Sequence, residues 1–203
     1  REKLLAFSLN CSSSSEQLRK KLKHSNKILL PESVLHSISK LDVEYPLFFQ
    51  VKNTKNDFSQ VCGVEEFTSP PGVCHLPYRI MDGLGITEGD TIDVALVSLV
   101  KGSFIRLKLH TSNFAKLSDP KAILEQKLSK NYPVLTEGHT ISIEHLDKTY
   151  YIDVTKCEPC ETIQILNTNI NVDFDKPMDY VEPPPKPDYD TNRFPGKGYR
   201  LGN

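Results

Sequence analysis

TIDVALV, at residues 91–97, alternates apolar with polar side chains, and SFIRLKL, at residues 103–109, does the same. A repeat of two residues puts every second side chain on one face, which predicts strands with one buried face. Further strand patterns, rich in β-branched and aromatic residues, lie at residues 45–51, 61–67, 139–143, 149–154 and 161–166. Strand patterns outnumber helix patterns, so the sequence predicts a mixed, β-rich α/β fold.

Three segments have the spacing of an amphipathic helix, at residues 31–41, 77–84 and 120–130. The third has the clearest start, because Asp119 can cap its first turn and Pro120 suits its first position. These helices fall between the predicted strands, which fits the mixed fold class.

A short motif occurs twice, as TEGDTI at residues 87–92 and TEGHTI at residues 136–141. Each copy follows a predicted helix and leads into a predicted strand, and its Gly supplies the backbone freedom that a turn needs. The motif indicates either two duplicated helix–strand units or one turn geometry used twice.

Composition excludes several classes of protein. The 203 residues include 25 Lys and Arg against 26 Asp and Glu, a net charge of -1, which argues against a strongly basic nucleic-acid binder. No apolar run approaches the roughly 20 residues that a membrane-spanning helix needs. Five cysteines, an odd number, do not suit a disulfide scaffold, so we expect reduced thiols and a cytoplasmic or nuclear location.

Composition also divides the chain. Residues 1–27, Ser- and Lys-rich after residue 10, are expected to form a poorly ordered extension with at most a short surface helix. Residues 28–180 form the compact region. Residues 181–192 form a Pro-rich linker that can be neither helix nor central strand, because Pro lacks an N–H group and fixes φ. Residues 193–203 form a separate terminal segment.

Motifs for catalysis are weak. Cys157 and Cys160 form a C-x-x-C pair, which can bind zinc or cycle a disulfide, but no second pair has matching spacing. A Pro-containing turn with two incidental thiols explains the same residues. Cys74 adjoins His75, yet neighbours on a strand point to opposite faces. We therefore expect no catalytic residue, no metal site and no cofactor.

The terminal segment FPGKGYRLG, residues 194–202, has the pattern of a docking peptide. Phe194 and Leu201 are apolar anchors, and the glycines at 196 and 198 allow the backbone to lie close to a sheet edge. The same residues also fit a loose chain end, and the pattern alone does not separate the two.

A family resemblance separates them. Phe194, Gly196, Gly198, Leu201 and Gly202 resemble the SHP box, a linear motif of cofactors of the AAA ATPase valosin-containing protein. The compact region resembles the N-terminal domain of the ubiquitin fusion degradation protein 1 family. The matching stretches are LPESVL at 30–35, YPLFF at 45–49, CGVEEF at 62–67, GVCHLP at 72–77, KGSFIRL at 101–107, PKAILE at 120–125 and NVDFDKP at 171–177.

The resemblance implies a double-psi β-barrel over residues 28–115, an α/β roll over residues 116–180, the Pro-rich tail, and an SHP box within residues 193–203. It also implies a non-enzymatic adaptor that binds ubiquitin chains and brings their substrates to the ATPase N-domain for unfolding and proteasomal degradation, including ER-associated degradation. A second adaptor subunit is an expected partner. Cytoplasm, nucleus and ER surface are the expected locations, without nucleic-acid binding or membrane insertion.

The chain departs from the family pattern at some points. Residues 1–27 do not match the usual lead-in, and KLH at residues 108–110 stands where QPH is usual. The unusual start leaves open a paralogue that serves the same ATPase in protein translocation across an organelle membrane, and the two cysteines leave open a metal or thiol enzyme. No ubiquitin contact is assigned. Ubiquitin offers an apolar patch ringed by basic residues, so a mixed apolar and acidic surface is expected opposite it.

Overall fold

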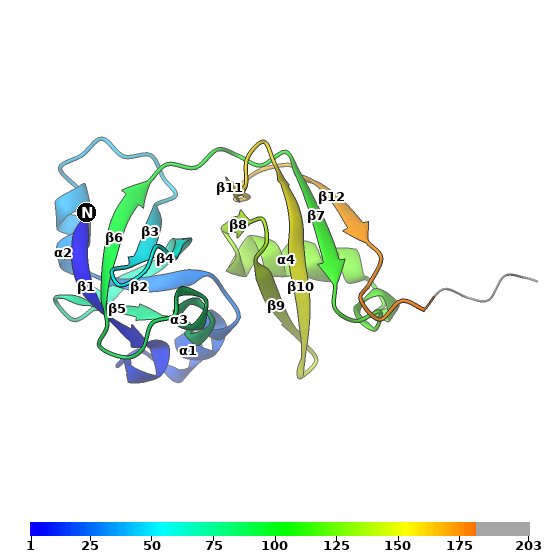
Figure 1. The fold of residues 1–203 in the computed structure, drawn as a ribbon, viewed down its shortest axis with the longest axis horizontal. Helices are drawn as coiled ribbons and strands as arrows, with labels where there is room; N and C mark the ends of the chain where they lie inside the picture. The colour runs from blue at the N-terminus through cyan, green and yellow to red at the C-terminus, as the bar shows by residue number, and fades with distance from the viewer. Residues whose placement is uncertain (182–203) are drawn as a thin grey trace, which may run out of the picture.

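In the computed structural model, which describes residues 1–181, the chain forms two lobes that lie side by side (Figure 1). The first lobe is a closed six-stranded barrel with strand order β1-β5-β2-β4-β3-β6. Its strands are β1 (Glu2–Ser8), β2 (Lys27–Pro31), β3 (Phe48–Asn53), β4 (Ser59–Ser69), β5 (Val73–Leu76) and β6 (Thr91–Val97). Its helices are η1 (Leu9–Cys11), α1 (Glu16–Lys23), α2 (Glu32–Ile38) and α3 (Tyr78–Leu84).

The barrel mixes parallel and antiparallel pairs. β1 runs parallel to β5, and β2 runs parallel to β4, while β3 pairs antiparallel with both β4 and β6. β1 and β6 close the barrel antiparallel, with Leu4 opposite Ile92. The alternation predicted for β6 is confirmed, because Ile92 and Val94 are buried while their neighbours are partly exposed.

The prediction that residues 1–27 are poorly ordered is wrong. β1 lies between β5 and β6 in the barrel, and Leu4 and Ala6 point into the core. Burial alternates along this strand, but its sequence does not, since residues 4–7 are all apolar, and its partners lie more than 60 residues away. The barrel therefore begins at β1 rather than at residue 28.

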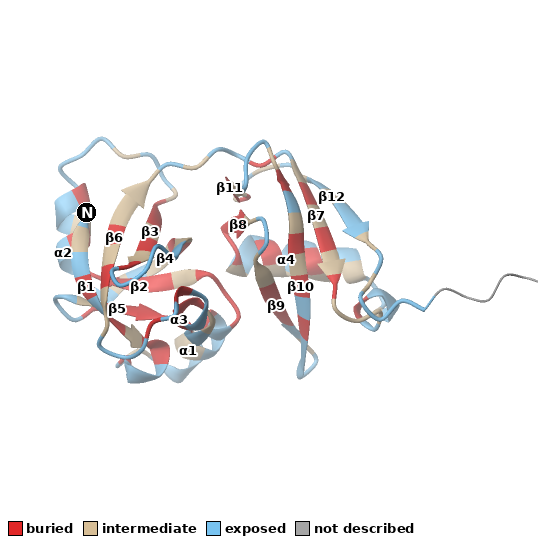
Figure 2. Cartoon of the chain, in the orientation of Figure 1, coloured by how far each residue is buried: buried red, intermediate tan, exposed pale blue. Residues whose placement is uncertain are grey.

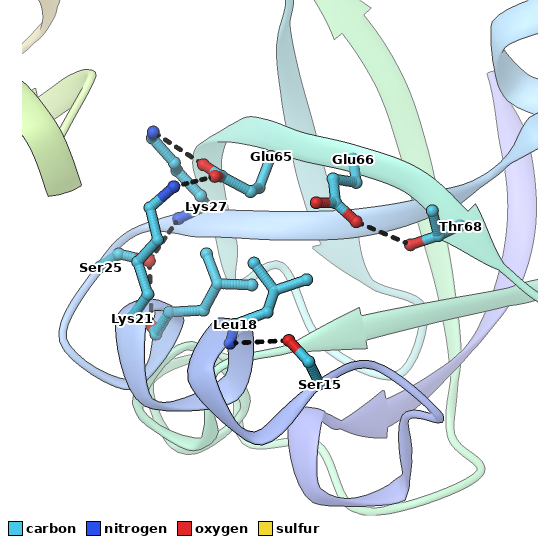
Figure 3. A network of polar contacts seen from close by, with 9 residues as sticks. Ser15, Leu18, Lys21, Ser25, Lys27, Glu65, Glu66 and Thr68 are labelled. Atoms are coloured by element: carbon cyan, nitrogen blue, oxygen red, sulfur yellow. Dashed lines mark hydrogen bonds and ion pairs between the residues drawn. The ribbon is translucent and has the colours of Figure 1, made fainter.

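Helix α1 also packs against this lobe. The hydroxyl of Ser15 accepts a hydrogen bond from the Leu18 backbone N–H at 3.2 Å, which caps the helix start. Leu22 is buried against Leu9 and Leu29. Figure 3 shows the polar side of the contact, where the ammonium groups of Lys21 and Lys27 both reach the carboxylate of Glu65 on β4.

The second lobe is built on a four-stranded sheet of order β12-β7-β10-β9, with a two-stranded sheet of β11 and β8 beside it. Its strands are β7 (Phe104–Leu109), β8 (Val134–Thr136), β9 (Thr140–His145), β10 (Lys148–Glu158), β11 (Thr162–Gln164) and β12 (Asn171–Asp175). Its helices are η2 (Phe114–Lys116) and α4 (Pro120–Asn131), and α4 packs Leu124 and Leu128 into the lobe's core.

Several sequence predictions are confirmed at the start of α4 and in the TEG turn of each lobe. The Asp119 carboxylate accepts a hydrogen bond from the Ala122 N–H at 3.0 Å, and Pro120 begins α4 as predicted. The Gly of each TEG turn has positive φ, 83° at Gly89 and 81° at Gly138, so the two turns share one backbone geometry.

The boundary between the lobes differs from the prediction of 115/116. The core of the first lobe ends at Val94 and the core of the second begins at Ile105, so β7 belongs to the second lobe. Figure 2 shows buried residues on the inner side of each lobe, with exposed loops around them. Residues 182–203, which include nearly all of the predicted linker and all of the predicted terminal segment, lie outside the described residues.

Candidate binding surface

A network of hydrogen bonds around Ser142 joins the two lobes. The Ser142 hydroxyl on β9 lies 2.9 Å from Nδ1 of His24 and 2.8 Å from Nη1 of Arg79. Arg79 also donates to the carbonyl of Thr140. Within the second lobe, the Tyr132 hydroxyl donates to the Ser142 carbonyl at 2.7 Å. Two side chains that lie far apart in the sequence of the barrel lobe thus converge on one strand of the other lobe.

The protonation state of His24 follows from this geometry. Burial lowers the pKa of His24, and the carboxylate of Glu144, 4.0 Å from Nε2, offsets the effect only in part. The ring is therefore neutral near pH 7. Because Ser142 accepts from Arg79, its own proton is free to be donated to Nδ1 of the neutral His24 ring.

The backbones of the lobes also approach closely. A Cβ atom on Gly63 of β4 would lie 2.5 Å from Cγ of Pro133, so only Gly fits there. Asn26 donates from its side chain to the carbonyl of Val134 and from its backbone to the carbonyl of Asn131. A cleft of about 390 Å³ lies along this junction, lined in part by Arg79 and His139. The hydrogen bonds of Asn26 and Arg79 hold the lobes together, so the junction fixes the position of one lobe relative to the other.

The two thiols of the C-x-x-C pair lie in different surroundings. Cys157 is buried, and burial, together with the Glu137 carboxylate, raises the pKa of its thiol to about 12. Cys160 is exposed and donates to the Thr162 carbonyl at 3.1 Å. A thiol with such a raised pKa is almost entirely protonated at neutral pH, so Cys157 is not a nucleophile.

The Cys74–His75 neighbours behave as the strand geometry predicts. Nδ1 of His75 lies 2.8 Å from the hydroxyl of Ser69, and burial lowers the pKa of the ring. Cys74 is buried in the barrel core, and burial raises the pKa of its thiol. Within residues 1–181, no group of three or more His, Cys, Asp or Glu side chains is arranged to hold a metal ion.

Two exposed apolar surfaces stand out. The first is the loop between α2 and β3, where Leu41 and Tyr45 are exposed and alternate with Asp42 and Glu44. This loop borders a hollow of about 650 Å³ that also contacts the end of β6. We call residues 41–45 the α2–β3 loop.

The second surface is a groove of about 790 Å³ between α4 and β12, which we call the β12 groove. Leu124 and Leu128 of α4 and Val172 and Phe174 of β12 contribute to its lining. β12 is an edge strand, and Met178, Tyr180 and Val181 are exposed just beyond it. The sequence does not locate either surface, because exposure of an apolar side chain depends on tertiary packing.

The predicted SHP box residues, Phe194, Gly196, Gly198, Leu201 and Gly202, lie outside the described residues. The structure therefore neither joins them to the α2–β3 loop or the β12 groove nor separates them from those surfaces, and their role stays a prediction.

Two family models match almost all of the described chain. Ubiquitin fusion degradation protein UFD1, N-terminal subdomain 1, matches residues 3–100, and N-terminal subdomain 2 of the same protein matches residues 101–177. The junction of the two models falls between β6 and β7, where the two cores also divide.

Several curated proteins are similar over most of this chain. "Ubiquitin fusion degradation protein 1 homolog" of Dictyostelium discoideum is 38% identical over 161 residues, which cover 79% of this chain and 48% of that protein. "Ubiquitin recognition factor in ER-associated degradation protein 1" of Homo sapiens is 34% identical over 165 residues, 81% of this chain and 53% of that protein. "Ubiquitin fusion degradation protein 1" of Saccharomyces cerevisiae is 35% identical over 162 residues, 77% and 44%.

The chain thus spans about half the length of the curated relatives it matches. The match runs through both lobes in order and begins at β1. Because the two models together cover most of its residues, the chain belongs to the ubiquitin fusion degradation protein 1 family.

Proposed function

We propose that this protein is a non-enzymatic ubiquitin-binding adaptor that delivers ubiquitylated proteins for degradation, including ER-associated degradation. One observation carries the proposal: both lobes match the family, and relatives with the same two lobes are named for ubiquitin recognition and ubiquitin fusion degradation. Burial raises the pKa of the Cys157 thiol to about 12, which argues against Cys157 as a nucleophile.

The proposed destination is the AAA ATPase valosin-containing protein, which would unfold the delivered substrates for the proteasome. The SHP box supports this part of the proposal, with Phe194 and Leu201 as apolar anchors and Gly196, Gly198 and Gly202 giving the backbone room to lie along a sheet edge. A second adaptor subunit belongs to the same proposed complex.

The finer fold assignment is part of the proposal. We propose that the barrel is of the double-psi type and that the second lobe is an α/β roll. The closed six-stranded barrel with two parallel pairs, β1/β5 and β2/β4, supports the first assignment, and α4 packed against a mixed sheet supports the second.

We place the protein in the cytoplasm and nucleus and at the ER surface, following the relatives named for ER-associated degradation. Within residues 1–181, no helix has both the length and the apolar character that crossing a bilayer requires. The translocation alternative depended on residues 1–27. These residues form β1 and α1, and the family model matches from residue 3, so they fit the family pattern; a paralogue that serves translocation would share both features and stays a prediction.

Retention of ubiquitin tests the proposal. The full 203-residue chain, which keeps β1 in the barrel, is passed over resin that carries linked tetra-ubiquitin and over resin that carries an unrelated protein of similar charge. Selective retention on tetra-ubiquitin is expected. Equal passage through both resins would contradict ubiquitin recognition by this chain.

A further inference from the structure

We propose that the α2–β3 loop, residues 41–45, together with the segment that follows β6, residues 98–100, forms the ubiquitin-contact surface of this protein. This inference rests on the proposed function, because it names where the proposed partner binds. It is argued from exposure, anchoring and unpaired charge.

The loop presents apolar side chains to solvent from a fixed base. Val43 packs against the barrel core, and Leu47, just after the loop, is buried. The Leu41 N–H donates to the Ile38 carbonyl at 2.9 Å, which ties the loop to the end of α2. Between these anchors, Leu41 is 58% exposed and Tyr45 is 75% exposed.

The opposite wall is fixed to the second lobe. The Gln164 side-chain amide donates to the Leu99 carbonyl at 2.8 Å, and the Gln164 backbone N–H donates to the Val100 carbonyl at 3.0 Å. The Gly102 N–H donates back to the Gln164 carbonyl at 2.9 Å. Val100, 56% exposed, therefore has a defined position near the hollow of about 650 Å³ that Leu41, Tyr45 and Leu99 help to line.

The α2–β3 loop carries two carboxylates that are exposed to solvent. Asp42 and Glu44 are exposed, and neither makes an ion pair with any residue among 1–181. Two unpaired carboxylates interleaved with Leu41 and Tyr45 are complementary to an apolar patch ringed by basic residues, the chemistry that ubiquitin offers. Lys40 borders the loop and restricts how a basic rim can sit on it.

The β12 groove is larger and more apolar but fits this partner less well. Two carboxylates line it, those of Asp175 and Glu125. Asp175 accepts a hydrogen bond from the Thr155 hydroxyl at 2.8 Å and lies 3.9 Å from Arg106, and Glu125 lies 3.9 Å from Lys121. Because both carboxylates are engaged within the lobe, the groove offers a basic partner less free charge than the α2–β3 loop does.

Matched substitutions test the apolar part of the surface. Binding of monomeric ubiquitin and of linked tetra-ubiquitin to the full chain is measured by calorimetry. Leu41→Ser and Tyr45→Ser are each expected to weaken binding at least about tenfold, because a few residues carry most of the energy of an interface and burial of an apolar side chain contributes about 1.5–3 kcal/mol. Phe58→Ser and Tyr78→Ser remove side chains that are equally exposed, 58% and 75%, elsewhere on the barrel lobe, and they should leave binding unchanged.

Charge reversal tests the acidic part. Asp42→Lys combined with Glu44→Lys is expected to weaken binding at least about tenfold and to reverse its salt dependence, because added salt then screens a repulsion between like charges. Asp147→Lys reverses an exposed charge on the β9–β10 turn and serves as the control, with no change in affinity expected. Thermal unfolding of each variant shows that it is folded.

The outcomes separate this inference from the proposed function. If the wild-type chain binds neither form of ubiquitin, the proposed function itself fails, and this surface assignment fails with it. If the wild-type chain binds and the loop variants bind equally well, the surface assignment alone is overturned. If Phe174→Ser loses binding and the loop variants keep it, the ubiquitin contact is assigned to the β12 groove instead, and this inference is overturned.

Discussion

Nδ1 of His24 lies 2.9 Å from the hydroxyl oxygen of Ser142, although 118 residues separate them in the sequence. His24 ends α1 in the barrel lobe, and Ser142 lies in β9 of the second lobe. With Arg79 on the same hydroxyl, the Ser142 side chain receives two side chains of the barrel lobe. Removal of the Ser142 hydroxyl should therefore lower the stability of the whole molecule.

Ser142→Ala is expected to lower the free energy of unfolding by about 1–3 kcal/mol, since it leaves buried polar groups of His24 and Arg79 without their partner. Urea unfolding measures the change. Ser59→Ala, which removes an exposed hydroxyl in β4, is the control and should change stability by less than about 0.5 kcal/mol. Equal stability of the two variants would show that the Ser142 contacts contribute nothing net.

Stability should fall as pH falls below about 7. Burial lowers the pKa of His24, His75 and His139 in the folded state, while an unfolded His titrates near 6.5. The unfolded chain therefore takes up protons first, and the stabilisation present above pH 6.5 is lost as pH falls toward the lowered folded pKa values. Urea unfolding from pH 7.5 to 5.5 measures this slope. His24→Gln should make the slope shallower, and an unchanged slope would exclude His24 as a contributor.

Gly63→Ala is expected to destabilise the protein by about 1–3 kcal/mol, because the new methyl group would overlap the Pro133 ring where the lobes meet. Gly83→Ala is the matched control. It lies in α3, where the nearest atom to an added Cβ is 3.8 Å away, so the higher helix propensity of Ala should leave stability unchanged or raise it by up to about 1 kcal/mol. Thermal unfolding of both variants decides the comparison.

Alkylation should distinguish the five thiols. Cys11 and Cys160 are exposed, whereas Cys62, Cys74 and Cys157 are buried, and burial raises the pKa of Cys62 and Cys157 to about 12. Brief treatment of the native protein with iodoacetamide at pH 7.5 should therefore modify the two exposed residues and spare the other three, as read by mass spectrometry. Rapid modification of Cys157 under native conditions would contradict a buried, protonated thiol.

Phe194→Ala and Leu201→Ala are each expected to abolish measurable binding of the tail peptide to the ATPase N-domain. Burial of such an apolar anchor contributes about 1.5–3 kcal/mol. Loss of that much binding free energy makes a roughly micromolar interaction too weak to measure. Calorimetry with a peptide of residues 193–203 measures the loss. Lys197→Ala changes a spacer position and should retain binding. Unchanged affinity in both anchor variants would refute the SHP-box assignment.

Sequence predicted the locally encoded parts of the fold. The strand over residues 91–97, the cap at Asp119 and the two Gly turns depend on neighbours in the chain, and each is confirmed. β1 was missed, because it is stabilised by pairing with β5 and β6. A short surface helix was allowed within residues 1–27, and α1 is that helix, although burial of Leu22 ties it to the barrel lobe. The boundary before β7 was missed for a similar reason, since β7 is assigned by its pairing with β10 and β12.

The candidate surface was predicted only in kind. A mixed apolar and acidic character follows from the chemistry of the expected partner, but several stretches of this sequence share it. Three features of the folded chain distinguish the candidate surfaces. Leu41 and Tyr45 are exposed, Val43 is anchored in the core, and Arg106 forms ion pairs with Asp173 and Asp175.

Val181, the last described residue, lies at the end of the second lobe that faces away from the barrel, whereas the α2–β3 loop lies on the barrel (Figure 1). The body between them acts as a spacer whose length is set by the hydrogen bonds across the lobe junction. The proposed ubiquitin site and the end of the described chain therefore lie on different lobes, and the contacts of Ser142 and Asn26 hold these lobes together.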